Sequence, residues 1–88
     1  MYLLEDIIDS LDRHHQRATF EAVAGLVGMP PLSVMSGEIK RQKNSWVVAK
    51  RNGLPTGYKG VEIHPALKER VAALKSSREL ADWLRNPC

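Results

Sequence analysis

The sequence is short of cysteine, aromatic side chains and long apolar runs. Its single cysteine, Cys88, has no partner for an internal disulfide, which favours a reducing compartment such as the cytoplasm. Aromatic residues make up only 6% of the chain, so we expect a mainly aliphatic core. No apolar run approaches the ~20 residues that span a bilayer, and the acidic start lacks the basic region of a signal peptide. We therefore expect a soluble cytoplasmic protein, associated with the nucleoid if the source is prokaryotic, and no membrane partner.

The length and bulk composition indicate one globular unit. With 88 residues, the chain is too short to bury two separate cores. It is 43% hydrophobic and 26% charged, which is typical of folded rather than disordered proteins. We therefore expect a single domain over residues 1–88.

Charge is divided unevenly along the chain. Residues 1–12 carry four acids and no base, whereas residues 39–61 carry six bases and no acid. A basic stretch interleaved with Trp46 and Tyr58 favours a polyanion such as DNA as the partner. A solvated basic surface without a ligand is the alternative reading.

The first half of the chain has the periodicity of three helices. Residues 3–14 place leucine and isoleucine at helical spacing, with acids on the other face. Thr19 suits the N-cap of a second helix, which Gly28 ends. Pro31 suits the first turn of a third helix over residues 31–41. Two short helices joined by a glycine-containing turn predict a helix-turn-helix unit.

The second half begins with β-prone residues. Residues 45–50 contain Trp46 and two valines, and Asn52-Gly53 is a strong hairpin signal. Pro65 then suits the start of a fourth helix with Leu67, Val71 and Leu74 as its stripe. Ser76 or Ser77 caps a last helix, ended by Pro87, whose apolar residues are Leu80, Trp83 and Leu84. The expected fold is mainly α: a winged helix-turn-helix with a small β-hairpin wing and two C-terminal helices.

Part of this order of residues matches a known pattern, which runs through Thr19–Ala24, Gly28, Pro30, Val34, Val47–Val48 and Leu54–Tyr58. From about Arg17 to Gly60 the chain resembles the C-terminal winged-helix domain of alkylguanine-DNA alkyltransferases and the alkyltransferase-like proteins. The resemblance implies a DNA-binding scaffold.

The departures from that family concern its chemistry. Its reactive cysteine falls on Asn44, which cannot act as a thiolate nucleophile, and its supporting histidine falls on Ser45. The helix arginine that replaces a flipped base falls on Leu32, and the aromatic that helps rotate a phosphate falls on Phe20. The resemblance therefore implies a protein that binds DNA, and could inspect it, without transferring an alkyl group.

We find no catalytic constellation, and we expect no enzymatic activity. His14, His15 and His64 lack the further ligands that would complete a metal set, and no sequence motif implies a cofactor. The expected function is non-catalytic binding of duplex DNA, as a regulator or a damage-sensing alkyltransferase-like protein. The residues expected to contact DNA are Ser33, Ser36, Gly37, Lys40 and Arg41 on the third helix, Lys43, Asn44 and Trp46 after it, and Lys50, Arg51, Tyr58 and Lys59 on the wing. Trp46 and Tyr58 either brace the wing or stack on a base, and bracing is favoured.

A protein-protein interaction module on the same scaffold is the alternative function. In that case the acidic first helix would dock a basic partner, or the basic segment an acidic one. A homodimer through Leu80, Trp83 and Leu84 is also open, although Trp83 fits the core better because its apolar neighbours share its face.

Overall fold

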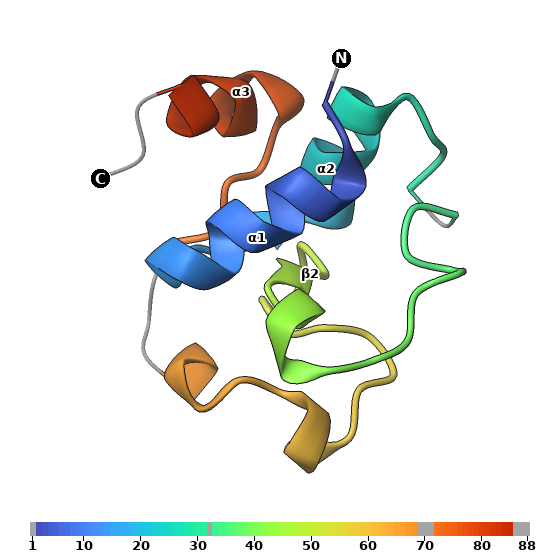
Figure 1. The fold of residues 1–88 in the computed structure, drawn as a ribbon, viewed down its shortest axis with the longest axis vertical. Coiled ribbons are helices and arrows are strands. Elements are labelled where there is room, and N and C mark those ends of the chain that lie inside the picture. The colour runs from blue at the N-terminus through green and yellow to red at the C-terminus, as the bar shows by residue number, and fades with distance from the viewer. Residues whose placement is uncertain (1, 32, 69–71, 86–88) are drawn as a thin grey trace.

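Three α-helices lie together in one half of the molecule, and loops and 3-10 helices form the other half (Figure 1), with one short pair of strands between them. The computed structural model describes residues 2–31, 33–68 and 72–85. The elements are α1 (Leu4–His14), β1 (Ala18–Thr19), α2 (Phe20–Val27), the 3-10 helix η1 (Gln42–Asn44), β2 (Val47–Val48), the 3-10 helices η2 (Gly60–Glu62) and η3 (Pro65–Lys68), and α3 (Ser77–Arg85). The expectations for Leu32, Val71, Pro87 and Cys88 lie outside the described residues. Within the described ranges, no helix has the length and apolar character to cross a membrane.

The first two helices form where the sequence predicts them. Helix α1 buries Ile7, Ile8 and Leu11 and ends at His15, which adopts a left-handed conformation with φ of 53°. Thr19 caps α2, because its Oγ1 accepts a hydrogen bond from the backbone N–H of Ala22 at 3.2 Å. Gly28, with φ of 73°, ends α2 as expected.

The last helix is also confirmed, and it packs closely on α2. Ser76 Oγ accepts from the backbone N–H of Glu79 at 3.1 Å, and Leu80 is fully buried, which removes it from any exposed dimer surface. A methyl group placed on Gly25 of α2 would lie 2.1 Å from Ser77 Oγ. The absence of a side chain at Gly25 therefore lets the two helices approach.

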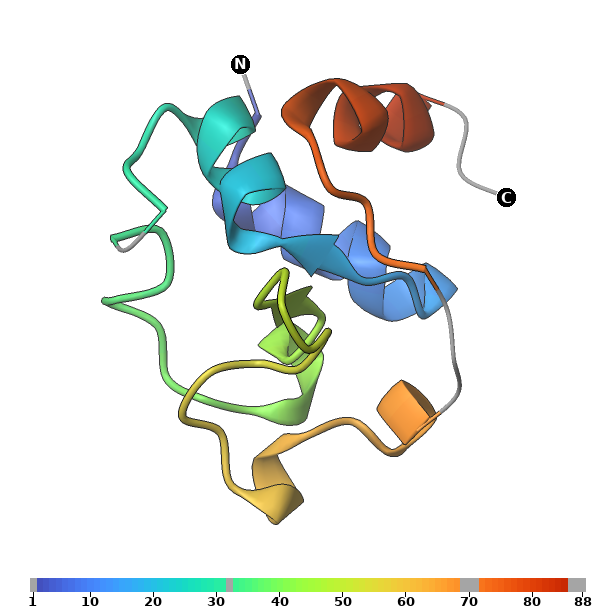
Figure 2. The same cartoon turned by 180° about the vertical axis from the view of Figure 1, so that it is seen from behind.

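Strand β1 is the centre of a parallel arrangement rather than a partner in a hairpin. It pairs in parallel with β2, in the register Ala18 with Val47 and Thr19 with Val48. On its other edge, the Thr19 N–H donates to the carbonyl of Leu74 and the Leu74 N–H donates to that of Arg17, both at 2.9 Å. Figure 2 shows the segment before α3 running beside this strand. Strand β1 therefore links two segments that are distant from it in the chain, residues 47–48 and the segment around Leu74.

The prediction of a β-hairpin wing is wrong. The Asn52-Gly53 turn does form: Gly53 has φ of 67°, and the Ala49 N–H donates to the Leu54 carbonyl at 2.9 Å. However, the described residues after the turn form no strand. Pro55 lacks an N–H for a ladder, and the strand that pairs with β2 is β1, in parallel. The turn therefore closes a loop, residues 49–54.

The expected third helix is also wrong over the described residues 33–41, which form a series of turns. The backbone N–H of Ser33 donates to the carbonyl of Pro30 at 2.9 Å, and the backbone N–H of Ser36 donates to the carbonyl of Ser33 at 3.1 Å. The apolar residues do not share one face, because Val34 is 2% exposed and Ile39 is 82% exposed. Serine and glycine are also weak helix formers. The mainly α class holds, but the described chain contains neither the recognition helix nor the wing.

Of the expected fourth helix, the described residues 65–68 form the 3-10 helix η3, and residues 69–71 lie outside the described ranges. Leu67 is buried as predicted. Leu74, however, lies in an extended segment that pairs with Ala18. The backbone hydrogen bonds that Leu74 makes to β1 take the place of helical ones.

Candidate nucleic-acid interface

The residues expected on a recognition helix are spread over loops. Ser33 is half-buried, whereas Ser36 and Gly37 are exposed. Ser36 Oγ donates to the carbonyl of Ser33 at 2.9 Å, so this hydroxyl stabilises the turn. Lys40 is exposed and lies across the next loop, because a methyl group on Gly57 would be 3.4 Å from its Cε. These four residues therefore do not form the single helix face that was expected.

Asn44, at the position of the family's reactive cysteine, belongs to the interior. Its side chain is 0% exposed. Its Nδ2 donates to the Ile39 carbonyl at 2.8 Å, and its Oδ1 accepts from the Arg41 N–H at 3.1 Å. The expectation that Asn44 contacts DNA is wrong for this arrangement, since a residue buried and bonded in this way is closed to a ligand.

Tyr58 completes the bonding of Asn44. Its hydroxyl donates to Asn44 Oδ1 at 2.6 Å. Burial, together with the nearby carboxylates of Glu38 and Glu62, raises the pKa of Tyr58 to about 12, although Arg41 acts in the opposite direction. The hydroxyl is therefore a stable donor at neutral pH, and its role is to hold the loop against η1.

Trp46 braces the core rather than presenting a stacking surface. It is 1% exposed, and its indole Nε1 donates to Asp12 Oδ1 of α1 at 3.0 Å. The rings of His15 and His64 lie against it, with centroids at 5.3 Å and 5.0 Å. A base cannot reach the indole face, so the expected DNA contact at Trp46 is also wrong.

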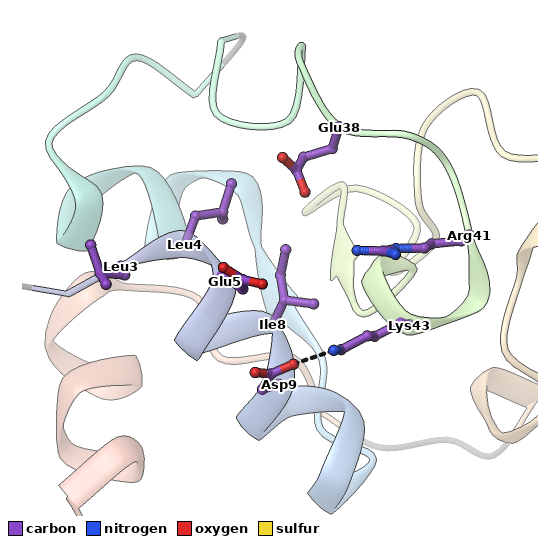
Figure 3. Close-up of a pocket in the computed structure, with 8 residues that line it drawn as sticks. All are labelled: Leu3, Leu4, Glu5, Ile8, Asp9, Glu38, Arg41 and Lys43. Carbon is purple, nitrogen blue, oxygen red and sulfur yellow. Dashed lines mark ion pairs between the residues drawn. The ribbon is translucent and has the colours of Figure 1, made fainter.

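Two of the expected DNA-binding cations face the acidic helix. Lys43 Nζ forms an ion pair with Asp9 Oδ1 at 2.5 Å. Arg41 points into a hollow beside α1, toward the side where Glu5 and Glu38 lie (Figure 3). Asp9 offsets the charge of Lys43, which reduces the attraction of this lysine for phosphate.

All six cations of the basic segment are exposed. Lys43 is paired with Asp9 and Arg41 lines the hollow beside α1, which leaves four on other loops: Lys40, Lys50, Arg51 and Lys59. Within the described chain none of the four forms an ion pair with a carboxylate. Lys40 and Lys59 belong to neighbouring segments, which lie side by side in Figures 1 and 2. Lys50 and Arg51 occupy the loop of residues 49–54. These four side chains are the charges of the segment that a polyanion can approach most easily.

Arg17 positions that loop, a role that the sequence did not reveal. Its position after α1 suggested only a cation at a helix end. Its Nη1 donates to the Gly53 carbonyl at 3.0 Å, and its Nη2 donates to the carbonyl of Leu67. A glycine suits position 53 both because φ is positive and because Arg17 Nη1 would lie 3.1 Å from a methyl group there. No local pattern could have paired Arg17 with residues so far along the chain.

The described residues contain no cluster of three or more metal-ligating side chains, although the structure brings the rings of His15 and His64 to 4.9 Å from each other. Comparison with known proteins returns no matching family model, curated protein or solved structure. The structure therefore presents a buried core from which exposed lysine and arginine side chains project on loops.

Proposed function

We propose that this protein binds duplex DNA, without a chemical step, through the loop-borne cations Lys40, Lys50, Arg51 and Lys59. The observation that carries the proposal is their exposure without carboxylate partners in the described chain. Lysine and arginine attract phosphate at any base sequence, because the phosphate backbone carries no sequence information.

The structure alters the expected mode of binding. With no helix over residues 33–41 to enter the major groove, the contacts fall on the phosphate backbone. Asn44 and Trp46 stabilise the loops from within, and Arg17 fixes the loop that bears Lys50 and Arg51. A fixed loop loses less conformational entropy when it binds, which supports contact through short loops.

The resemblance to alkyltransferase-like proteins is a separate prediction. It supports DNA as the partner, but the buried Asn44 leaves no accessible group at the position of the reactive cysteine. The DNA proposal depends only on the four exposed cations, so it stands whether or not the chain is related to that family.

Fluorescence anisotropy with a labelled duplex at several salt concentrations tests the proposal. With about four phosphate contacts, the logarithm of the binding constant falls by about 3 to 4 for each tenfold rise in salt. Absence of binding at low salt, or a binding constant that is independent of salt, would contradict it.

A matched pair of variants separates the loop cations from overall charge. Lys50→Glu with Arg51→Glu removes two of the proposed contacts, and we expect it to weaken binding strongly. Lys75→Glu with Arg78→Glu makes the same change in net charge at exposed residues near and within α3. Equal losses in both variants would show that net charge alone, and not this surface, attracts the DNA.

A further inference from the structure

A hollow of about 450 Å³ lies between the first half of α1 and residues 38–43 (Figure 3). Its apolar wall comes from Leu3, Leu4 and Ile8 of the N-terminal segment. Leu3 is 59% exposed at the edge of the hollow, whereas Ile8 is only 4% exposed. The hollow therefore offers aliphatic surface that a partner could remove from water.

Charged side chains surround this apolar wall. The Asp9–Lys43 ion pair, at 2.5 Å, closes one side. Arg41 points inward from the loop, while Glu5 and Glu38 complete the lining. Among the described side chains, neither Glu5 nor Glu38 forms an ion pair with a lysine or arginine. The lining thus contains three carboxylates and two cations. The pair of Asp9 and Lys43 leaves two carboxylates against Arg41, so the lining has a net negative charge.

The lining therefore has two parts. Leu3, Leu4 and Ile8 form an apolar centre, and charged side chains of α1 and of residues 38–43 form a rim around it. An apolar centre with a charged rim is the usual composition of a protein interface.

We propose that this hollow docks a basic amphipathic segment of another protein. An aliphatic side chain of the segment packs on Leu4 and Ile8, and its lysine or arginine side chains pair with Glu5 and Glu38. Charge complementarity selects this occupant, because the unpaired carboxylates attract cations over an apolar wall. The exposed Leu3 at the edge of the hollow extends the apolar surface, which favours a peptide segment over a single small molecule. The surface involves none of the cations proposed to contact DNA.

Anisotropy titration of the full chain with a synthetic probe tests the proposal. The probe is a labelled helical peptide of about 12 residues, or about three turns, with leucine on one face and lysine on the other. Two control peptides replace lysine with glutamate or scramble the order at constant composition. We expect saturable binding of the amphipathic basic peptide in a one-to-one complex, and weaker binding of both controls.

Variants locate the binding on this hollow. Glu5→Gln with Glu38→Gln removes the proposed partners of lysine without changing side-chain size, and we expect about a tenfold loss of affinity. Leu3→Ser, at an exposed position, is expected to weaken binding by removing apolar contact. Glu79→Gln with Asp82→Asn removes the same charge from exposed positions of α3, and it should leave the affinity within about twofold.

Three outcomes would overturn the proposal. The first is no saturable binding of the amphipathic basic peptide, and the second is an equal loss in the α3 control, which indicates general charge attraction. The third is a dimer in light scattering that Glu5→Gln with Glu38→Gln dissociates, because a second copy would then be the occupant.

Discussion

The hydroxyl of Tyr58 donates to Oδ1 of Asn44 over 2.6 Å, and so ties the loop that bears Lys59 to η1. The same oxygen accepts the N–H of Arg41 at 3.1 Å. The amide nitrogen of Asn44 donates to the Ile39 carbonyl at 2.8 Å. One buried amide therefore organises a region that the sequence had suggested would be the end of a helix.

Tyr58→Phe should destabilise the fold by about 1–2 kcal/mol, because it removes one hydrogen bond to a buried acceptor that keeps a second donor. Urea unfolding followed by tryptophan fluorescence measures the change. Tyr2→Phe is the matched control: Tyr2 is at the exposed N-terminal end, and its hydroxyl makes no hydrogen bond within the described chain. Equal stability of the two variants would show that the Tyr58 bond contributes nothing.

The same tyrosine predicts a loss of stability at alkaline pH. Burial and nearby carboxylates raise the pKa of Tyr58 from 10.0 to about 12 in the folded protein. Below pH 10 the phenol is neutral in both states. Between pH 10 and 12 the unfolded chain releases this proton while the folded chain retains it, so rising pH favours unfolding.

The measurement compares wild type with Tyr58→Phe. The difference in their free energies of unfolding should be constant below pH 10 and should shrink toward pH 12. In a Tyr2→Phe background, the near-ultraviolet absorbance of phenolate follows Tyr58 alone, and its midpoint should lie near 12. A midpoint near 10.0 would contradict the burial of this hydroxyl.

Asp12→Ala should cost about 1–3 kcal/mol, because it leaves the buried indole N–H of Trp46 without its acceptor. Asp12→Asn keeps an acceptor oxygen at the same place and should recover most of that loss. Asp9→Ala removes an exposed ion pair from the same helix and should cost at most about 1 kcal/mol. Thermal unfolding by circular dichroism ranks the three, and a larger loss for Asp9→Ala would refute the bracing role of Asp12.

Gly25→Ala should separate α2 from α3, because the new methyl group would lie 2.1 Å from Ser77 Oγ. The expected cost is about 1–3 kcal/mol for overpacking, reduced by up to about 1 kcal/mol through alanine's better helix propensity. Gly37→Ala has open space around the new methyl group. It should change stability little when both variants are compared with wild type by differential scanning calorimetry. A stabilising Gly25→Ala would show that the two helices pack more loosely.

The elements defined by local signals were predictable from the sequence. The stripe of α1, the cap at Thr19, the glycine at 28 and the serine before α3 each act within a few residues. The buried Ile7, Ile8 and Leu11 follow from helical spacing alone. The Asn52-Gly53 turn also formed, since glycine tolerates its positive φ.

The elements that depend on distant partners were not predictable. Val47 and Val48 look like one arm of a hairpin, yet Ala18 and Thr19 of β1 pair with them in parallel. For the candidate site, exposure of Lys40, Lys50, Arg51 and Lys59 agrees with the expectation. The pairing of Lys43 with Asp9 depends on α1 meeting a loop far along the chain, which no local pattern encodes.

Both edges of β1 are hydrogen-bonded to segments later in the chain, and this affects when the protein folds during synthesis. The neighbours of Ala18 and Thr19 come from residues 47–48 and from Leu74, so a growing chain has to reach Leu74 before β1 is enclosed. Until then, the N-terminal helices leave the ribosome with an incomplete apolar face, which is a condition that invites chaperone binding. The core around β1 is therefore expected to form only after the segment that contains Leu74 has emerged.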